Sequence, residues 1–174
     1  YNYDNLAVRD AEIDLGYPTS FRWKDLYLSG GVFLGGTGLA NKLDDYETGS
    51  WTPVVVGSTS AGTGTYQSRV GKYTKIGNRV LIEAQVFMTA HTGSGAFLIN
   101  GLTFASRNEA PGGYNFERPL ATSNSYLNGA VDIVVNNNTT SLVLVLNPQD
   151  GSSVSNYAID GLSRIRLSGH YDVA

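Results

Sequence analysis

The sequence contains no cysteine, which excludes a disulfide framework and a thiolate metal site. Charged side chains make up only 16% of its 174 residues, the formal net charge is −3, and lysine and arginine nowhere form a run. We therefore expect no nucleic-acid partner, because such partners select strongly basic surfaces. No apolar run approaches the roughly 18 to 20 residues that span a bilayer, so we expect no membrane insertion.

Histidine is scarce as well, with only His91 and His170 in the chain. Neither belongs to a group of residues that suits general-base catalysis, so we expect them in a loop or on a solvent-facing strand. The only dense acidic group consists of Asp44, Asp45 and Glu47, and we expect it to form a solvated turn and not a cation site. We accordingly expect no metal ion and no cofactor.

The catalytic and phosphate-binding motifs are incomplete. Residues 31–37 have glycines at the spacing of a phosphate-binding loop, but Thr37 stands where the lysine is needed. Residues 93–95 lack the full G-x-S-x-G element of a hydrolase. A glycosidase needs two converging carboxylates, and the sequence does not show whether its scattered ones converge; these are Glu109, Glu117, Asp132, Asp150 and Asp160. We expect a protein without catalytic activity, with a polysaccharide depolymerase as an alternative.

Glycine is abundant, with 21 residues, and together with the low charge it suits an all-β protein with many turns. The clearest strand pattern lies in residues 79–89, where one face is apolar and is expected to point into the core. That face carries Val80, Ile82, Ala84, Val86 and Met88. In the last strand, one face carries Ile165, Leu167, Gly169 and Tyr171.

Further strands are expected at residues 51–56, 65–70, 72–76, 96–100, 122–127, 130–135, 141–146 and 157–159. Turns are expected at residues 77–78 and 136–139, because Gly and Asn tolerate the left-handed backbone region. About eight to ten strands with regular turns and no helical period favour an antiparallel sandwich of two sheets, of the jelly-roll type.

Residues 1–45 form a Gly-rich region with little capacity to fold alone. We expect short strands at residues 23–28 and 32–34, which bury too little apolar surface to offset their ordering entropy. A single copy would expose Trp23, Leu26, Leu28, Val32, Phe33 and Leu34. Winding three copies about one axis would cover these side chains and close the strand edges, so we predict an intertwined, trimeric β stem.

The stem is expected to end in a turn made by Asp, Gly and Ser within residues 44–50. Trp51 then begins a run of strand-favouring residues, and Pro53 suits the start or the edge of a strand because it has no N–H to donate. We therefore divide the chain into a stem, residues 1–45, and a sandwich domain, residues 46–174. The chain begins at Tyr1 and not at methionine, so we expect a fragment or a processed product.

Residues 43–53 resemble the L-D-D-Y-E-E-G-T-W-T-P opening of a module that is common near the C-termini of bacteriophage fibre and tailspike proteins. Residues 71–80, 99–104 and 165–171 match later segments of that module in order, and residues 21–29 are similar to the R-W-K-D-L-Y-L-S unit of phage fibre shafts. The resemblance covers both parts of the chain. It implies a homotrimer with a jelly-roll-like tip, located in the virion and outside the cell, with other tail or fibre proteins as partners.

The irregular stretch at residues 105–119 contains the candidate ligand-binding site. Its loop combines aromatic side chains, which can stack on sugar faces, with polar side chains that can bond to hydroxyl groups. The candidates are Tyr114, Asn115, Phe116 and Arg118, with Tyr126 as a weaker one. Alternatively, Tyr114 or Phe116 only caps the core or a contact between chains.

These observations favour a non-catalytic fibre tip that attaches the virion to a host cell. The expected ligand is a cell-surface glycan or protein, bound by three weak sites that gain avidity on one axis. One alternative is a purely structural domain that trimerises or caps a tail or head fibre. The other is the depolymerase mentioned above.

Overall fold

The structure, a computed structural model, describes residues 23–108, 131–146, 155–156 and 163–173. The strands expected at residues 122–127 and 157–159 lie outside these ranges. The chain divides into two compact units, and the boundary falls between Lys42 and Leu43.

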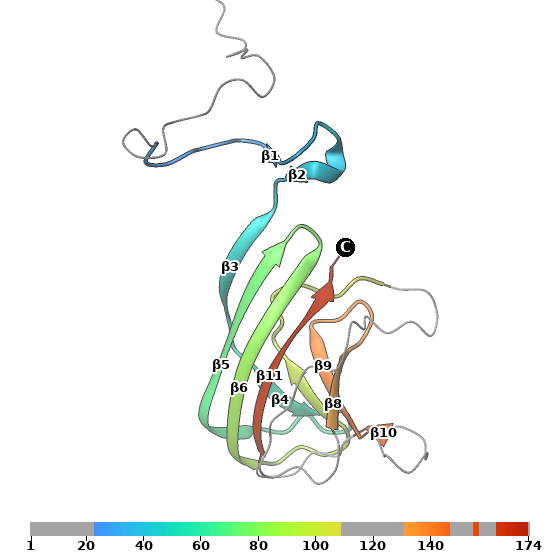
Figure 1. Ribbon diagram of the computed structural model, residues 1–174. Helices are drawn as coiled ribbons and strands as arrows, with labels where there is room; N and C mark the ends of the chain where they lie inside the picture. Colours follow the sequence, from blue (N-terminus) through green and yellow to red (C-terminus); the bar gives the residue numbers. More distant parts are fainter. Residues whose placement is uncertain (1–22, 109–130, 147–154, 157–162, 174) are drawn as a thin grey trace, which may run out of the picture. The chain divides into compact units, whose positions relative to one another are not determined.

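The first unit has little regular structure in its described part. β1 (Val32–Phe33) pairs with β2 (Lys42–Leu43), which lies at the boundary of the units, and a short 3-10 helix, η1 (Leu39–Asn41), directly precedes β2 (Figure 1). The strand expected at residues 23–28 is wrong, because these residues belong to no strand. A strand needs a neighbour to complete its hydrogen bonds, and no described segment pairs with this one.

The second unit consists of two antiparallel sheets, and no α-helix occurs in the part of the chain that the structure describes (Figure 1). The first sheet has the order β11-β6-β5-β3. Its strands are β3 (Tyr46–Trp51), β5 (Gly64–Ile76), β6 (Arg79–His91) and β11 (Ser163–Asp172). The second sheet has the order β10-β9-β7-β4, and β8 also pairs with β9. Its strands are β4 (Val54–Gly57), β7 (Phe97–Asn100), β8 (Val131–Val135), β9 (Ser141–Leu146) and β10 (Ser155–Asn156). The expected all-β, antiparallel fold is confirmed.

The core lies between the two sheets, and β6 is its longest contributor. Val80, Val86 and Met88 are fully buried, whereas Leu81 on the other face of the strand is 44% exposed. The predicted alternation of β6 is therefore confirmed. The first sheet adds Ile165, Leu167 and Tyr171 of β11, and the second sheet adds Val55, Phe97, Ile99, Ile133, Val135, Leu142 and Leu144. Fully burying one such side chain stabilises the fold by about 1.5–3 kcal/mol.

The segment around Pro53 differs from the sequence-based expectation. Residues 44–50 were expected to form a turn, but residues 46–51 form β3. The expected strand at residues 51–56 is instead split, because β3 belongs to the first sheet and β4 to the second. The chain crosses between the sheets at Thr52 and Pro53. Proline suits this position, because it has no N–H group that would need a partner in a sheet.

The two strands expected at residues 65–70 and 72–76 are one strand, β5, of 13 residues. Its register against β6 shifts near Tyr66, where the sheet has a β-bulge. The turns were predicted correctly: Gly77 has a φ of 58° between β5 and β6, and Asn138 has a φ of 52° between β8 and β9.

Candidate functional site

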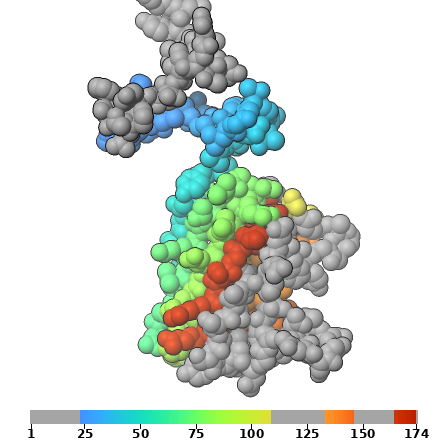
Figure 2. Space-filling model, viewed as in Figure 1, coloured from blue at the N-terminus to red at the C-terminus, as the bar shows by residue number. Residues whose placement is uncertain are grey.

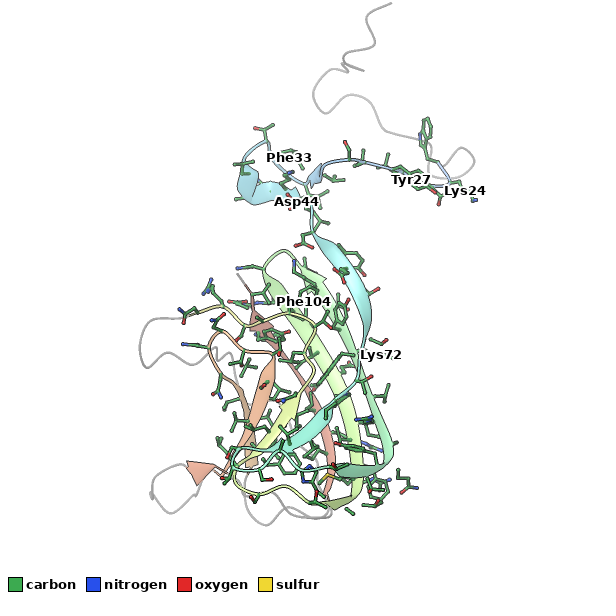
Figure 3. The ribbon with its side chains drawn as sticks, turned by 180° about the vertical axis from the view of Figure 1, so that it is seen from behind. Lys24, Tyr27, Phe33, Asp44, Lys72 and Phe104 are labelled. Atoms are coloured by element: carbon green, nitrogen blue, oxygen red, sulfur yellow. The ribbon has the colours of Figure 1, made fainter. Side chains whose placement is uncertain are left out.

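The predicted ligand-binding residues Tyr114, Asn115, Phe116, Arg118 and Tyr126 lie outside the described residues, so their role stays a prediction. The predicted stem residues are described. In the single chain Trp23 is 69%, Leu26 62% and Leu34 58% exposed, and Leu28 and Val32 are exposed as well. Tyr27 and Phe33 of the same unit, which Figure 3 labels, are also exposed. The first unit thus leaves its apolar side chains uncovered, as the sequence predicted for a single copy.

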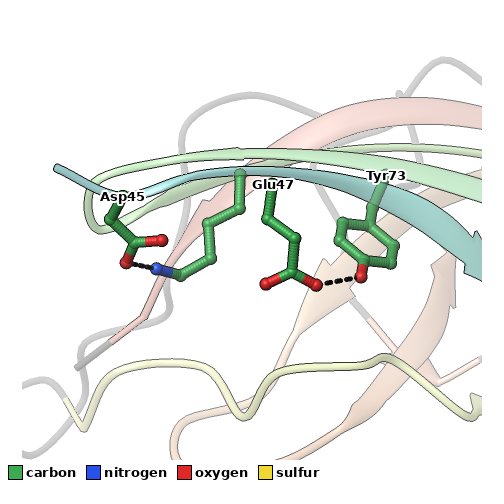
Figure 4. A network of polar contacts seen from close by, with 4 residues as sticks. Asp45, Glu47 and Tyr73 are labelled. Atoms are coloured by element: carbon green, nitrogen blue, oxygen red, sulfur yellow. Dashed lines mark hydrogen bonds and ion pairs between the residues drawn. The ribbon is translucent and has the colours of Figure 1, made fainter. Parts of the chain in front are cut away.

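The acidic group at the start of β3 is bound to its neighbour β5. Asp45 forms an ion pair with Lys75, whose side chain is buried, and the carbonyl of Asp45 accepts a hydrogen bond of 2.8 Å from the N–H of Gly77 (Figure 4). The expected turn is therefore wrong for Asp45, whose side chain nevertheless remains 46% exposed. The pairing of two strands explains this position of Asp45. β3 lies antiparallel to β5, with Glu47 opposite Lys75, so the preceding residues of the chain also lie close to Lys75.

Glu47 accepts a hydrogen bond from the hydroxyl of Tyr73 (Figure 4). This bond raises the pKa of Tyr73 above its ordinary value, and desolvation and the charge of Glu47 act in the same direction. The Tyr73 ring meets Phe104 edge-on, at 5.4 Å between ring centroids. The Nζ of Lys75 lies 5.6 Å from the centre of the same Phe104 ring.

Two glycines make room for this arrangement. A Cβ atom on Gly71 would lie 2.4 Å from the indole of Trp51, and one on Gly49 would lie 2.6 Å from the ring of Tyr73. Since Cβ atoms are not found so close to other atoms, a larger residue at either glycine would force the opposite ring to shift. The spacing of the aromatic residues and glycines on β3 and β5 therefore encodes the pairing of the two strands.

The C-terminal strand joins the same cluster. The hydroxyl of Tyr171 donates a hydrogen bond of 3.0 Å to the carbonyl of Phe104. Burial raises the pKa of Tyr171 to about 12. Residues 43–53, 71–80, 99–104 and 165–171, which carry the phage-fibre resemblance, thus contact one another. We name the set Asp45, Glu47, Trp51, Gly71, Tyr73, Lys75, Phe104 and Tyr171 the motif cluster.

His91 has a structural role at the other end of the second unit. Its Nδ1 accepts a hydrogen bond of 2.8 Å from the N–H of Gly93, and its Nε2 lies 3.0 Å from the carbonyl oxygen of Val55. With Nδ1 as the acceptor, Nε2 is the ring nitrogen that can donate to the Val55 carbonyl. His91 thereby connects β4 to the loop at residues 92–96, and this loop bonds to the loop at residues 58–63 through Ser60 and Ser94.

The outer face of the first sheet, opposite the core, carries a groove of about 580 Å³. It is lined by Thr48, Gly49, Ser50, Lys72, Tyr73, Thr74, Leu81 and Glu83. The register places six of these residues in two rows across β3, β5 and β6, and the pair Gly49 and Tyr73 lies between the rows. Thr48 faces Thr74, which faces Leu81, and Ser50 faces Lys72, which faces Glu83. The volume lies within the range of small-molecule sites.

Sequence reasoning missed this groove. It arises only when β3 pairs with β5, and residues 44–50 had been assigned to a turn. The alternating hydroxyl side chains Thr48 and Ser50 were the available signal, because a period of two places them on one face of a strand.

Within the described ranges, no three His, Cys, Asp or Glu residues gather in a way that could hold a metal ion. The same ranges contain no helix that is both long and apolar enough to cross a membrane.

No protein-family model matches the chain, and no curated protein matches its sequence. Among solved structures, that of the Dettilon tailspike protein is similar, with a TM-score of 0.49 and 22% identity. The similarity covers 73% of this chain and 24% of the tailspike chain, so this chain spans about a quarter of that protein's length. A likeness of this strength establishes neither a family nor a function.

Proposed function

We propose that this chain is the C-terminal part of a phage fibre or tailspike-type protein, which trimerises through its stem and attaches the virion to a host-surface glycan without catalysing a reaction. The observation that carries the proposal is the motif cluster. Four segments were matched separately to the fibre module, and their residues contact one another through Asp45–Lys75, Glu47–Tyr73, and the contacts of Phe104 with Tyr73 and Tyr171. A chance match of four short segments would give no reason for their contact.

The exposed stem supports the trimer. Trp23, Leu26 and Leu34 each expose more than half of their surface, and such side chains gain stability when other copies cover them. Three tips held on one axis then bind a repetitive surface with an avidity well above the affinity of one site. Weak single sites are sufficient for such attachment.

The test is binding of the labelled chain to a panel of bacterial strains, before and after removal of surface polysaccharide. The proposal predicts binding to some strains that is lost on removal. Alanine substitutions at Tyr114, Phe116 and Arg118 then test the predicted loop. Binding that survives removal would contradict a glycan ligand, and a folded trimer that binds no strain would contradict the role in attachment.

A second candidate is a structural domain that trimerises or caps a fibre and has no host ligand. The motif cluster favours it too, because the matched residues are used to hold strands together and not to present groups to a ligand. The cell-binding experiment separates the two, since a structural domain would bind no strain.

A further inference from the structure

We propose that the outer face of the first sheet binds an acidic saccharide, with Lys72 and Arg166 holding its negative charge and Glu83 accepting hydrogen bonds from its hydroxyl groups. This inference deepens the proposed attachment function and rests on it. It places the ligand in the groove described above and in the adjoining part of β11.

The strand register brings the charged side chains of this face together. Lys72 of β5 lies opposite Glu83 of β6, and Glu83 lies opposite Ser168 of β11. In the next row Gln85 faces Arg166, and in the row after that Phe87 faces Arg164. β6 and β11 run side by side on the surface in Figure 2.

Among the described residues of this face, cations outnumber carboxylates. Lys72, Arg164 and Arg166 are all exposed, with Glu83 as the carboxylate among them. Arg79 and Asp172 also lie there, but they form an ion pair of 3.1 Å with each other. The excess of positive charge on one face of a chain with a net charge of −3 attracts an anionic ligand to that face.

The two arginines are held in place. The Nε of Arg166 donates a hydrogen bond of 3.1 Å to Oε1 of Gln85, and the guanidinium of Arg164 lies 4.8 Å from the centre of the Phe87 ring. Neither contact uses all the N–H groups of a guanidinium, which has five. Both groups can therefore donate to a carboxylate or phosphate without being reorganised first.

The groove has the remaining groups that a sugar requires. Thr48, Ser50 and Thr74 present hydroxyl groups that donate and accept hydrogen bonds, and Glu83 is an acceptor for sugar hydroxyls. Leu81, 44% exposed, supplies an apolar surface for the C–H groups of a ring. No ion pair within 4.0 Å joins Lys72 to Glu83 in the described structure, so neither group is occupied by the other.

A second copy of the chain is a less suitable occupant. The centres of protein–protein interfaces are depleted of charged residues, whereas Lys72 and Glu83 stand in the middle of this face. The exposed apolar side chains of the face form no large patch: Tyr46 and Ile76 face each other, whereas Val70 faces Gln85 and Leu81 faces Thr74. The following test gives different results for a bound saccharide and for a bound second copy of the chain.

The experiment measures the affinity of the full chain for an array of acidic saccharides that carry uronic acid, sialic acid or phosphate. Each member is paired with its carboxyl-reduced or dephosphorylated form. We expect binding to acidic members only, and a loss of about tenfold or more in the double variant Lys72→Gln, Arg166→Gln. The matched control is Lys24→Gln, Arg69→Gln, which removes the same charge elsewhere and should stay within about twofold.

Glu83→Gln distinguishes a saccharide site from general attraction of anions. It makes the face more positive, so simple charge attraction predicts tighter binding. A saccharide whose hydroxyls bond to the carboxylate predicts a loss of a few fold instead, because hydrogen bonds to a charged acceptor are the stronger ones. Tighter binding by this variant would overturn the proposal.

Three other results would overturn it. These are equal binding of acidic and neutral partners, an equal loss in the control variant, and a change of oligomeric mass in the Lys72→Gln, Arg166→Gln variant, which would show a contact between copies. The attachment function is judged separately on cells. If the double variant still binds cells in a polysaccharide-dependent way, the attachment function holds and the site on the outer face is wrong. If the wild-type chain binds no strain, both proposals are wrong.

Discussion

The two units of this chain use apolar residues in opposite ways. In the second unit, side chains such as Phe97, Ile99 and Val86 are fully buried between two sheets. In the first unit, Leu39 is 82% and Tyr27 is 89% exposed. An apolar side chain contributes to a core only where a second layer covers it, and the described part of the first unit has a single pair of two-residue strands. The second unit therefore has a hydrophobic core of its own, which the described part of the first unit lacks.

The largest expected effect comes from opening the core. Phe97→Ala should lower the free energy of unfolding by about 3–5 kcal/mol, because it removes a fully buried ring and leaves a cavity. Leu39→Ala in the first unit should change it by less than about 0.5 kcal/mol. Urea denaturation followed by the fluorescence of Trp51, with Trp23→Phe as the background, measures both. Equal effects of the two substitutions would remove the contrast between the units.

Alkaline pH should weaken the second unit through Tyr171. The folded state holds the phenolic proton up to a pKa of about 12, whereas in the unfolded state the ordinary value is 10.0. The stability that comes from this group is complete below pH 10 and is lost as the pH rises towards 12, a loss of about 2–3 kcal/mol. Urea denaturation between pH 9.5 and 11.5 checks this. The Tyr171→Phe variant should lose less over that window, and an identical slope would show that other groups cause the loss.

Filling the space beside Trp51 should cost less. Gly71→Ala places a Cβ atom 2.4 Å from the indole, so we expect a loss of about 1–3 kcal/mol from overpacking. Gly30→Ala in the first unit is the matched control, because a Cβ there meets no atom within 4 Å. The measurement is the thermal unfolding temperature of both variants, each compared with that of the wild type. A neutral Gly71→Ala would show that β3 and β5 do not need a glycine at this position.

Breaking the ion pair at the start of β3 should have the smallest effect. Asp45→Asn leaves the buried Lys75 without its carboxylate, but the side chain of Asp45 is itself 46% exposed, so we expect a loss of about 1 kcal/mol. Asp25→Asn, which breaks the exposed pair with Lys24, should have no measurable effect. Thermal unfolding of both variants and the wild type checks this. If all three unfold at the same temperature, the ion pair of Asp45 with Lys75 does not stabilise β3.

The sequence predicts the strands whose patterns are long and regular. β6 was found because five alternate positions are apolar, and the turn at Asn138 was found because Asn accepts a positive φ. β3 was missed because Asp, Glu, Gly and Ser are locally typical of a turn. Its pairing depends on Tyr73 and Lys75, about 25 to 30 positions away in the sequence, and local composition carries no such information.

The same limit applies to the sites. The prediction of Tyr114, Phe116 and Arg118 as ligand-binding residues uses only the aromatic and polar residues that are close together in the sequence. The outer-face groove instead combines side chains from three strands, so Lys72 and Glu83 become neighbours only through the register of β5 and β6. A binding surface on a sheet is set by register, and a one-residue slip would turn these side chains into the core.

The most direct test of the account is the molar mass of the folded chain in solution, measured by light scattering at low micromolar concentration. An account in which the stem is completed by other copies predicts a mass of three 18.6-kDa chains, and a return to smaller species when Leu26 and Leu34 are changed to serine. A folded wild-type chain with the mass of a single copy would contradict it.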